Sequence, residues 1–236
     1  MAQERDEEAI RERVRYFDEE GLGWYPNIDL GHGITTKTRQ VFGEDLDHPS
    51  RRWREIASAV PKSLAGMSVL DVGCNAGWMC FEAMDRGATD VVGIDLKQGY
   101  IDQAQFCADV RGQTADFRVG DIYDLAQLGR TFDFVFCIAL LYDCNYLMRA
   151  VEALSRVCGS TLIVETAIHP DECDTPLVRY VRSQNGARLP GIWHPNMAAL
   201  KAIFEEQKFA VVKDLFTEGR RGGIVARRQR RATERT

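Results

Sequence analysis

Short apolar runs alternate with amphipathic stretches of helical length from residue 68 onward. Near-continuous apolar runs are typical of strands that are buried on both faces of a parallel sheet. The five runs cover residues 68–72, 90–95, 116–119, 132–138 and 160–165, and the helical stretches cover 77–86, 99–110, 145–157 and 196–207. A closing antiparallel hairpin is predicted from residues 209–216 and 223–228. The alternation predicts an α/β fold, a doubly wound, mostly parallel seven-stranded sheet with helices on both faces.

The residues before this pattern predict a helical and loop cap over 1–62. Residues 5–19 carry apolar side chains on one helical face among many charges, which indicates an amphipathic helix. The stretch 20–48 is rich in glycine and aromatic residues and predicts loop, and a helix is expected over 49–60.

The core is expected over 63–236, with a lid in the long insertion 167–195 that follows the fifth strand. An insertion of this length at the carboxyl edge of a sheet is usually functional. We therefore expect residues 1–48 and 167–195 to enclose the acceptor.

Composition narrows the class of protein. The 236 residues are 45% hydrophobic and 28% charged, which is ordinary for a globular protein. No apolar run approaches the ~18–20 residues of a membrane helix, and the charged N-terminus lacks a secretory h-region. The seven cysteines show no C-x-x-C spacing, which favours free thiols in a reducing cytoplasm over disulfides or a zinc site. The net charge of −5 gives no overall basic field for nucleic acid. Arginines crowd the C-terminus, where a solvated tail is expected and a contact with phosphate or an anionic partner is the alternative.

The first apolar run ends in a glycine-containing loop, VLDVGCNAGW at residues 69–78. Gly73 permits a sharp turn after the strand, and Gly77 permits close approach of the backbone to a ligand where the helix begins. Ligands of open α/β sheets bind at the carboxyl ends of the strands, where this loop lies. The glycine spacing does not fit the G-x-G-x-x-G loop of NAD(P) oxidoreductases.

The loop resembles the D-x-G-x-G-x-G motif of class I S-adenosyl-L-methionine (SAM)-dependent methyltransferases, with Asn75 at the middle glycine. Asn tolerates positive φ better than most residues. The resemblance implies the Rossmann-like methyltransferase fold, SAM as cofactor and S-adenosyl-L-homocysteine (SAH) as product. It also implies that Asp95 accepts hydrogen bonds from the ribose and that Asp121 and Ile122 meet the adenine. The residues expected to bind the cofactor are Asp71, Gly73, Asn75, Gly77, Asp95, Leu96, Asp121, Ile122, Cys137 and Tyr142.

Three further segments, 24–36, 141–144 and 192–200, resemble one branch of these enzymes. That branch contains the bacterial tRNA wobble-uridine methyl- and carboxymethyltransferases and their shorter relatives. This chain is short and acidic and has Asp143 where the branch usually has His, which favours a small-molecule acceptor over tRNA. Ordinary SAM is expected rather than carboxy-SAM.

Methyl transfer to a hydroxyl or phenol also needs a base. The candidates are His32, Asp143, Glu165, His169 and His194, and the sequence leaves the choice among them open. Residues expected to face the acceptor are Trp24, Tyr25, Arg179, Tyr180 and Trp193. No metal is expected, because no paired carboxylates recur at the spacing of the metal-dependent catechol methyltransferases.

The sequence therefore predicts a cytoplasmic SAM-dependent methyltransferase acting at oxygen on a small biosynthetic molecule. The alternatives are a tRNA wobble-uridine enzyme of the same branch, with nucleic acid disfavoured as a partner, and a catalytically silent SAM-binding subunit. Neither a membrane partner nor an oligomeric state is indicated.

Overall fold

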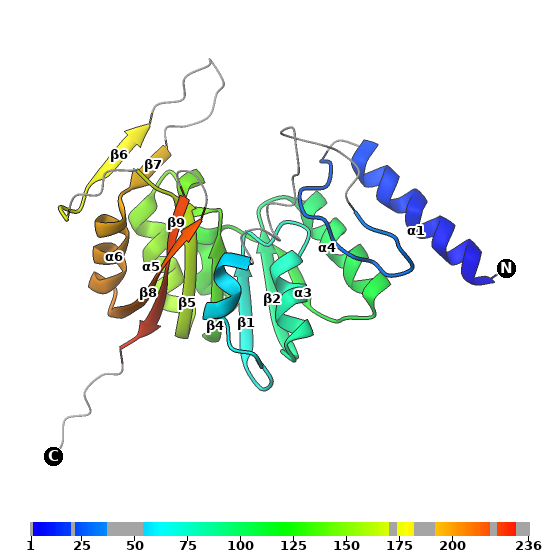
Figure 1. The fold of residues 1–236 in the computed structure, drawn as a ribbon, viewed down its shortest axis with the longest axis horizontal. Coiled ribbons are helices and arrows are strands. Elements are labelled where there is room, and N and C mark those ends of the chain that lie inside the picture. The colour runs from blue at the N-terminus through cyan, green and yellow to red at the C-terminus, as the bar shows by residue number, and fades with distance from the viewer. Residues whose placement is uncertain are drawn as a thin grey trace. The chain divides into compact units, whose positions relative to one another are not determined.

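The strands of the computed structural model follow the predicted order. Placement is described for residues 2–19, 22–36, 54–169, 174–181, 192–217 and 221–229. Seven strands lie in one sheet in the order β3-β2-β1-β4-β5-β9-β8, and β6 and β7 form a separate two-stranded ribbon (Figure 1). The strands are β1 (Ser68–Val72), β2 (Asp90–Asp95), β3 (Asp116–Val119), β4 (Phe132–Ile138), β5 (Cys158–Ala167), β6 (Val178–Val181), β7 (Ile192–Pro195), β8 (Phe209–Thr217) and β9 (Arg221–Arg228).

Helices follow β1, β2 and the turn after β4, and further helices precede β1 and β8. They are α1 (Ala2–Glu19), α3 (Trp78–Asp85), α4 (Gln98–Arg111), α5 (Leu147–Val157) and α6 (Met197–Glu206), with short 3-10 turns η1 (Ala57–Ala59), η2 (Ile122–Leu128) and η3 (Leu141–Asp143). The pairs β1–β2, β2–β3 and β4–β5 are parallel, whereas β9 pairs antiparallel with β5 and β8. The mostly parallel, doubly wound α/β prediction is confirmed.

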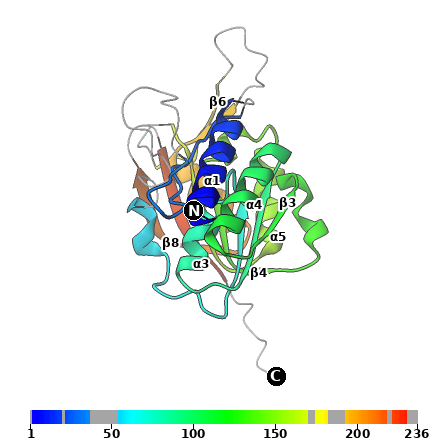
Figure 2. The same ribbon diagram turned by 90° about the vertical axis from the view of Figure 1, so that its right-hand side faces the viewer.

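The chain divides into two compact units, Met1–Gly120 and Asp121–Thr236. In the first unit, α1 packs beside α4, as both views show (Figures 1 and 2). The ring centroids of Phe17 on α1 and Phe106 on α4 lie 5.7 Å apart. Apolar side chains of α1, the segment 22–36, α3 and α4 form one core cluster, because each of these elements presents an apolar face to the others.

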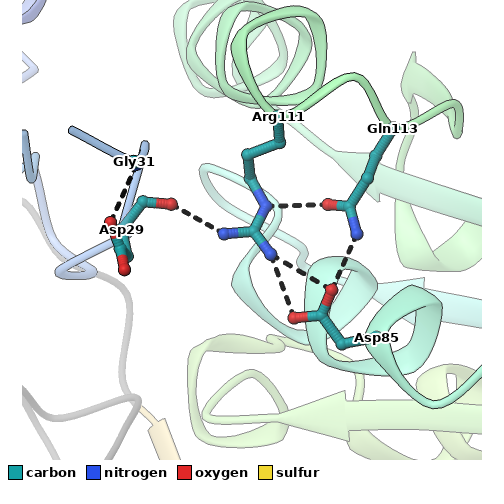
Figure 3. A network of polar contacts seen from close by, with 5 residues as sticks. All are labelled: Asp29, Gly31, Asp85, Arg111 and Gln113. Carbon is teal, nitrogen blue, oxygen red and sulfur yellow. Dashed lines mark hydrogen bonds and ion pairs between the residues drawn. The ribbon is translucent and has the colours of Figure 1, made fainter.

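A polar network around Arg111 links the segment 22–36 to α3 and α4 (Figure 3). The guanidinium donates to the carbonyl of Asp29 at 2.6 Å and to the Asp85 carboxylate at 2.9 Å. Gln113 links Arg111 Nε, at 2.7 Å, to Asp85, at 2.8 Å. Gly31 N–H donates to the Asp29 carboxylate at 2.8 Å, so the turn that offers the Asp29 carbonyl is itself braced.

In the second unit, β4 and β5 form the buried centre, and the predicted hairpin 209–228 is present as β8 and β9. The ribbon β6–β7 lies inside the insertion 167–195, for which no strand was predicted. Its strands have four residues each, and Val178 and Tyr180 are exposed, so no continuous apolar run reveals them.

Several sequence expectations fall partly outside the described residues, among them the loop 20–48, the lid 167–195 and the C-terminal arginine stretch. Of the helix expected over 49–60, residues 49–53 lie outside, residues 54–56 are helical, and η1 follows. Six of the seven cysteines lie in described segments, and all six are buried free thiols, as expected. Among the described residues, no helix is long and apolar enough to cross a membrane.

Candidate functional site

The loop after β1 turns through three residues of positive φ. The φ values are +79° at Gly73, +50° at Asn75 and +86° at Gly77. Asn75 supports its own conformation, because its side-chain oxygen accepts a hydrogen bond from Ala76 N–H at 2.8 Å. The loop is fixed to β2 as well, since the N–H groups of Gly73 and Cys74 both donate to the carbonyl of Ile94, at 2.8 and 2.9 Å.

Gly77 also approaches the core of the first unit closely. A Cβ at this position would lie 3.0 Å from the Phe117 ring and 3.2 Å from Ala104 Cβ. The packing beside Gly77 therefore leaves little room for a side chain. Close approach of this glycine to a ligand stays a prediction, and the loop and the start of α3 lie where they were expected.

Asp95 ends β2 and faces this loop. Its Oδ2 accepts from Asn75 N–H at 3.0 Å, and its Oδ1 accepts from Lys97 N–H at 3.0 Å. A carboxylate has about four lone-pair directions, so each oxygen keeps capacity for a further donor such as a sugar hydroxyl. The next residue, Leu96, is 66% exposed. A hydrogen-bond acceptor next to an exposed apolar surface fits the ribose and base of a nucleoside.

Asp71 lies in β1 behind the loop and is buried. Burial raises its pKa to about 7, Cys80 lowers it by a hydrogen bond from its thiol, and the Asp95 carboxylate raises it. The Asp71 side chain therefore lies inside the core of the first unit, where it accepts a hydrogen bond from Cys80 of α3.

Four predicted cofactor residues lie in the second unit. Tyr142 belongs to η3, and the other three are Asp121, Ile122 and Cys137. Asp121 is the N-cap of η2, and its Oδ1 accepts from Tyr123 N–H at 3.0 Å. Ile122 and Cys137 are buried, at 7% and 0% exposure. These positions fix the start of η2 and the end of β4. Contact with a cofactor stays a prediction for all four.

Glu165 holds the turn after β4. Its carboxylate is fully buried and pairs with the Arg221 guanidinium through two hydrogen bonds, Nε to Oε1 and Nη2 to Oε2, the second at 2.7 Å. The same Oε2 accepts from Ala139 N–H at 3.1 Å. Sequence reasoning missed Arg221, because it was grouped with the arginines of an expected tail. The signal available was its place before Gly222, at the start of the closing strand.

Tyr142 and Asp143 lie in η3, directly after β4. The Arg221 guanidinium carbon lies 4.9 Å from the centre of the Tyr142 ring. Partial desolvation raises the pKa of Asp143, and the positive charge of Arg221 lowers it by a smaller amount. Asp143 is exposed to solvent, so its carboxylate is accessible to an acceptor.

The ribbon β6–β7 has two faces of different chemistry. Arg179 lies opposite His194 and Tyr180 opposite Trp193 in the register, so each pair shares a face. The Tyr180 and Trp193 rings lie 4.7 Å apart, and Trp193 Nε1 donates to the carbonyl of Asn145 at 3.1 Å.

His169 lies two residues beyond β5 and contacts Arg179 of this ribbon. Arg179 Nη1 lies 3.0 Å from His169 Nε2. Arginine only donates, so this imidazole nitrogen accepts and the ring proton resides on Nδ1 in this arrangement. His169 and Arg179 are therefore brought together, as are Tyr180 and Trp193.

The predicted site residues of the N-terminal segment lie in the first unit. Trp24 is 3% exposed, and its Nε1 donates to the Val14 carbonyl at 2.9 Å, so its indole is part of the core. Tyr25 is partly buried beside it. His32 is exposed, and its Nδ1 lies 3.4 Å from Glu7 of α1. Residues 22–36, the described part of this segment, place some side chains in the core of the first unit and others on its surface.

Within the described ranges of the chain, no group of three or more His, Cys, Asp or Glu side chains converges to hold a metal ion.

Comparison with known proteins identifies the family. Residues 69–160 match the family described as a methyltransferase domain. Over 167 residues the chain is 34% identical to magnesium-protoporphyrin O-methyltransferase of Rhodobacter capsulatus, which covers 69% of this chain and 71% of that enzyme. The chain belongs to the SAM-dependent methyltransferases, and SAM is the cofactor of that family.

Other relatives differ in length. Over 166 residues the chain is 32% identical to tRNA U34 carboxymethyltransferase of Alcanivorax borkumensis, covering 65% of this chain and 50% of that protein. The chain thus spans about half the length of that relative. The fold is similar to the N-terminal domain of EvdMO1, determined in the presence of SAH and D-fucose, with a TM-score of 0.67, 22% identity and coverage of 93% and 97%.

Proposed function

We propose that this protein transfers a methyl group from SAM to an oxygen of a small-molecule acceptor. The observation that carries the proposal is the arrangement of the loop after β1, which is bonded to Asp95 and lies next to the exposed Leu96. The chain also belongs to the methyltransferase family. Two relatives, the magnesium-protoporphyrin enzyme and a ubiquinone biosynthesis O-methyltransferase of Azorhizobium caulinodans, carry O-methyltransferase names, and both support oxygen as the methylated atom.

In the first unit, we assign SAM to the loop 73–77 and to Asp95. Asp95 accepts hydrogen bonds from the ribose hydroxyls with the lone pairs that Asn75 and Lys97 leave, and Leu96 covers an apolar face of the nucleoside. When bound, SAM supplies an already activated methyl group on a sulfonium. The protein must therefore supply position, exclusion of water and, for a hydroxyl acceptor, a base.

The base belongs to Asp143 or His169 of the second unit. The ion pair of Glu165 with Arg221 argues against Glu165 in this role, because a proton on the carboxyl would weaken that pair. Asp143 offers an accessible carboxylate of raised pKa. His169 offers an imidazole that Arg179 holds in one tautomer. The variants Asp143→Asn and His169→Gln separate the two candidates. Substitution of the true base lowers kcat and removes the acidic limb of the pH profile of kcat, whereas substitution of the other residue leaves that limb in place.

A tRNA acceptor is the second candidate function, because several relatives are named tRNA U34 carboxymethyltransferases. Two of the C-terminal arginines that could contact phosphate have other contacts. Arg221 is paired with Glu165, and Arg228 donates to the carbonyls of Cys158 and Ser155. These contacts favour a small acceptor, since they remove two cations from any phosphate-binding strip.

The test uses the full chain with methyl-labelled SAM. One arm offers hydroxylated aromatic acids and phenols, and the other offers total bacterial tRNA at several salt concentrations. Label in a phenol ether or ester, unaffected by added tRNA, supports the proposal. Label in tRNA, with the steep salt dependence of phosphate binding, contradicts it. SAM binding without transfer in either arm supports the silent-subunit alternative.

A truncated chain shows whether the residues after β9 contribute to turnover or to tRNA binding. The truncation should end after Gln229, because β9 continues to Arg228 and a shorter chain would lose part of the closing strand. If the small-molecule proposal holds, the truncated chain retains its turnover.

A further inference from the structure

We propose that Glu165 and Arg221 form a positioning pair that holds the turn after β4, and with it the Tyr142 ring, for methyl transfer. The inference rests on the proposed function, since it assigns a role within the second unit of the same enzyme. Neither residue is proposed to touch the reacting atoms.

The first observation is the depth of the pair. Glu165 is 0% exposed, and the Arg221 side chain is 21% exposed. Two hydrogen bonds join them in the fork geometry that only a guanidinium can make with a carboxylate. A buried ion pair of this kind contributes little net stability compared with apolar residues of the same volume. Its presence therefore calls for a role beyond holding the fold together.

The second observation is what the carboxylate holds. Ala139 has a φ of +59°, a conformation that is unfavourable for a residue with a Cβ. Its N–H donates both to the Glu165 backbone carbonyl at 2.8 Å and to Glu165 Oε2 at 3.1 Å. Strained residues persist where their surroundings fix them, and they cluster at functional sites. Glu165 thus fixes the point at which the chain leaves β4.

The third observation is what the guanidinium holds. Arg221 lies over the Tyr142 ring, 4.9 Å from its centre, which is within range of a cation–π contact. Burial acts to lower the pKa of Arg221, but its bonds to Glu165 and its contact with Tyr142 raise it, so the group stays charged. One ion pair therefore contacts both ends of the turn, Ala139 through the carboxylate and Tyr142 through the guanidinium.

The fourth observation explains how β9 brings Arg221 to this place. Two glycines follow it, and a Cβ at Gly223 would lie 2.2 Å from the Val164 carbonyl oxygen, while one at Gly222 would lie 2.8 Å from Ile168 Cδ1. β9 can therefore approach β5 only with glycine at these positions. Arg221 pairs in register with Ala167, at the carboxyl end of β5, where ligands of α/β sheets bind.

Arg228 provides a matched control on the same strand. It lies at the other end of β9, and its Nε and Nη2 both donate to the backbone carbonyl of Cys158, which begins β5. The substitution Arg→Lys removes the fork geometry and keeps the positive charge at either position. A purely structural role predicts similar effects at both ends, whereas a positioning role predicts a catalytic effect at Arg221 alone.

The experiment compares Arg221→Lys, Glu165→Gln and Arg228→Lys with the unmodified protein. Amide hydrogen exchange reports protection at Ala139 relative to Phe136 in the preceding strand β4. SAH release is measured with SAM and catechol, caffeate or 4-hydroxybenzoate as probe acceptors, and calorimetry gives the affinity for SAM.

We expect both variants of the pair to lose about 10-fold protection at Ala139, as for one lost hydrogen bond, while Phe136 is unchanged. We expect kcat to fall about 10- to 100-fold with unchanged SAM affinity, as for a misplaced reacting group. Arg228→Lys should change neither quantity. Unchanged Ala139 protection, or equal losses in Arg221→Lys and Arg228→Lys, would overturn the inference.

The proposed function fails separately. If the unmodified protein binds no SAM or methylates none of the probes while it methylates tRNA, the acceptor proposal is wrong. The exchange arm then still decides whether the pair holds the turn, and the kcat comparison is made with tRNA.

Discussion

Asn75 N–H donates to Asp95 Oδ2 at 3.0 Å, so the loop after β1 is fastened to the carboxylate that ends β2. This bond joins the loop after β1 to Asp95, the two sequence features that resemble the SAM-dependent methyltransferases. Asn is acceptable at the middle glycine of the motif for a separate reason. The residue keeps the left-handed backbone that the motif needs and adds a side-chain bond to Ala76 N–H.

The first prediction concerns this left-handed residue. Asn75→Gly should retain the loop and the affinity for SAM, because glycine adopts positive φ without cost. Asn75→Val should lower the free energy of unfolding by about 1–2 kcal/mol, since a β-branched residue is poorly accommodated at φ +50°. Urea denaturation and calorimetric SAM titration check both variants. Equal behaviour of the two would show that the loop conformation does not matter for binding.

The second prediction separates backbone strain from packing at Gly77. Both Gly77→Ala and Gly112→Ala place a side chain at positive φ, which costs about 1–2 kcal/mol. At Gly112 nothing lies within 4 Å of the new Cβ, whereas at Gly77 it meets Phe117 at 3.0 Å. Thermal and urea unfolding should therefore show a larger loss for Gly77→Ala. A loss no greater than that of Gly112→Ala would contradict the packing explanation.

The third prediction concerns pH and Asp71. Its pKa of about 7 in the folded protein exceeds the ordinary unfolded value of about 3.9. Between these values the folded state holds a proton that the unfolded state has released. Asp71 therefore stabilises the fold at low pH, and this contribution is lost as pH rises toward 7, by at most about 1.4 kcal/mol per pH unit.

Comparison with Asp71→Asn isolates this effect. The free energy of unfolding of the unmodified protein, minus that of the variant, should fall between about pH 4 and pH 7 and level off above it. Urea denaturation across this range measures the difference. A difference that is flat with pH would mean that Asp71 is not protonated in the fold.

The fourth prediction concerns Trp24, which the sequence placed among the acceptor residues. Because its indole is buried and bonded to the Val14 carbonyl, Trp24→Ala should lower the free energy of unfolding by about 3–5 kcal/mol. Trp24→Phe should lose less and leave the KM for the acceptor unchanged. A raised KM in the folded Phe variant would return Trp24 to the acceptor site.

The central sheet could be predicted from the sequence because its strands are continuous apolar runs that need no partner to be recognised. The ribbon β6–β7 could not, since its exposed Val178 and Tyr180 give no burial signal. Arg221 is the clearest case at the site. A charged residue in a basic, C-terminal stretch resembles a solvated one, and only tertiary pairing with Glu165, far away in the chain, gives it a buried partner.

The loop and Asp95 could be predicted because local motif and strand order together define their positions. The choice of base could not, because it depends on neighbours such as Arg179 and Arg221, which come from other parts of the chain. The packing constraint at Gly77 could not be predicted for the same reason. The side chains that fill the space beside it belong to α4 and β3.

Calorimetric titration of SAM into the unmodified protein, Asp95→Asn and Asp90→Asn tests the account most directly. Asp95 ends β2 and Asp90 begins it, so the same substitution is made at both ends of one strand. We predict that Asp95→Asn weakens SAM binding by about 1.5–3 kcal/mol, the scale of hydrogen bonds to a charged group, and that Asp90→Asn has no effect. An unchanged SAM affinity in folded Asp95→Asn, or no SAM binding by the unmodified protein, would contradict the account.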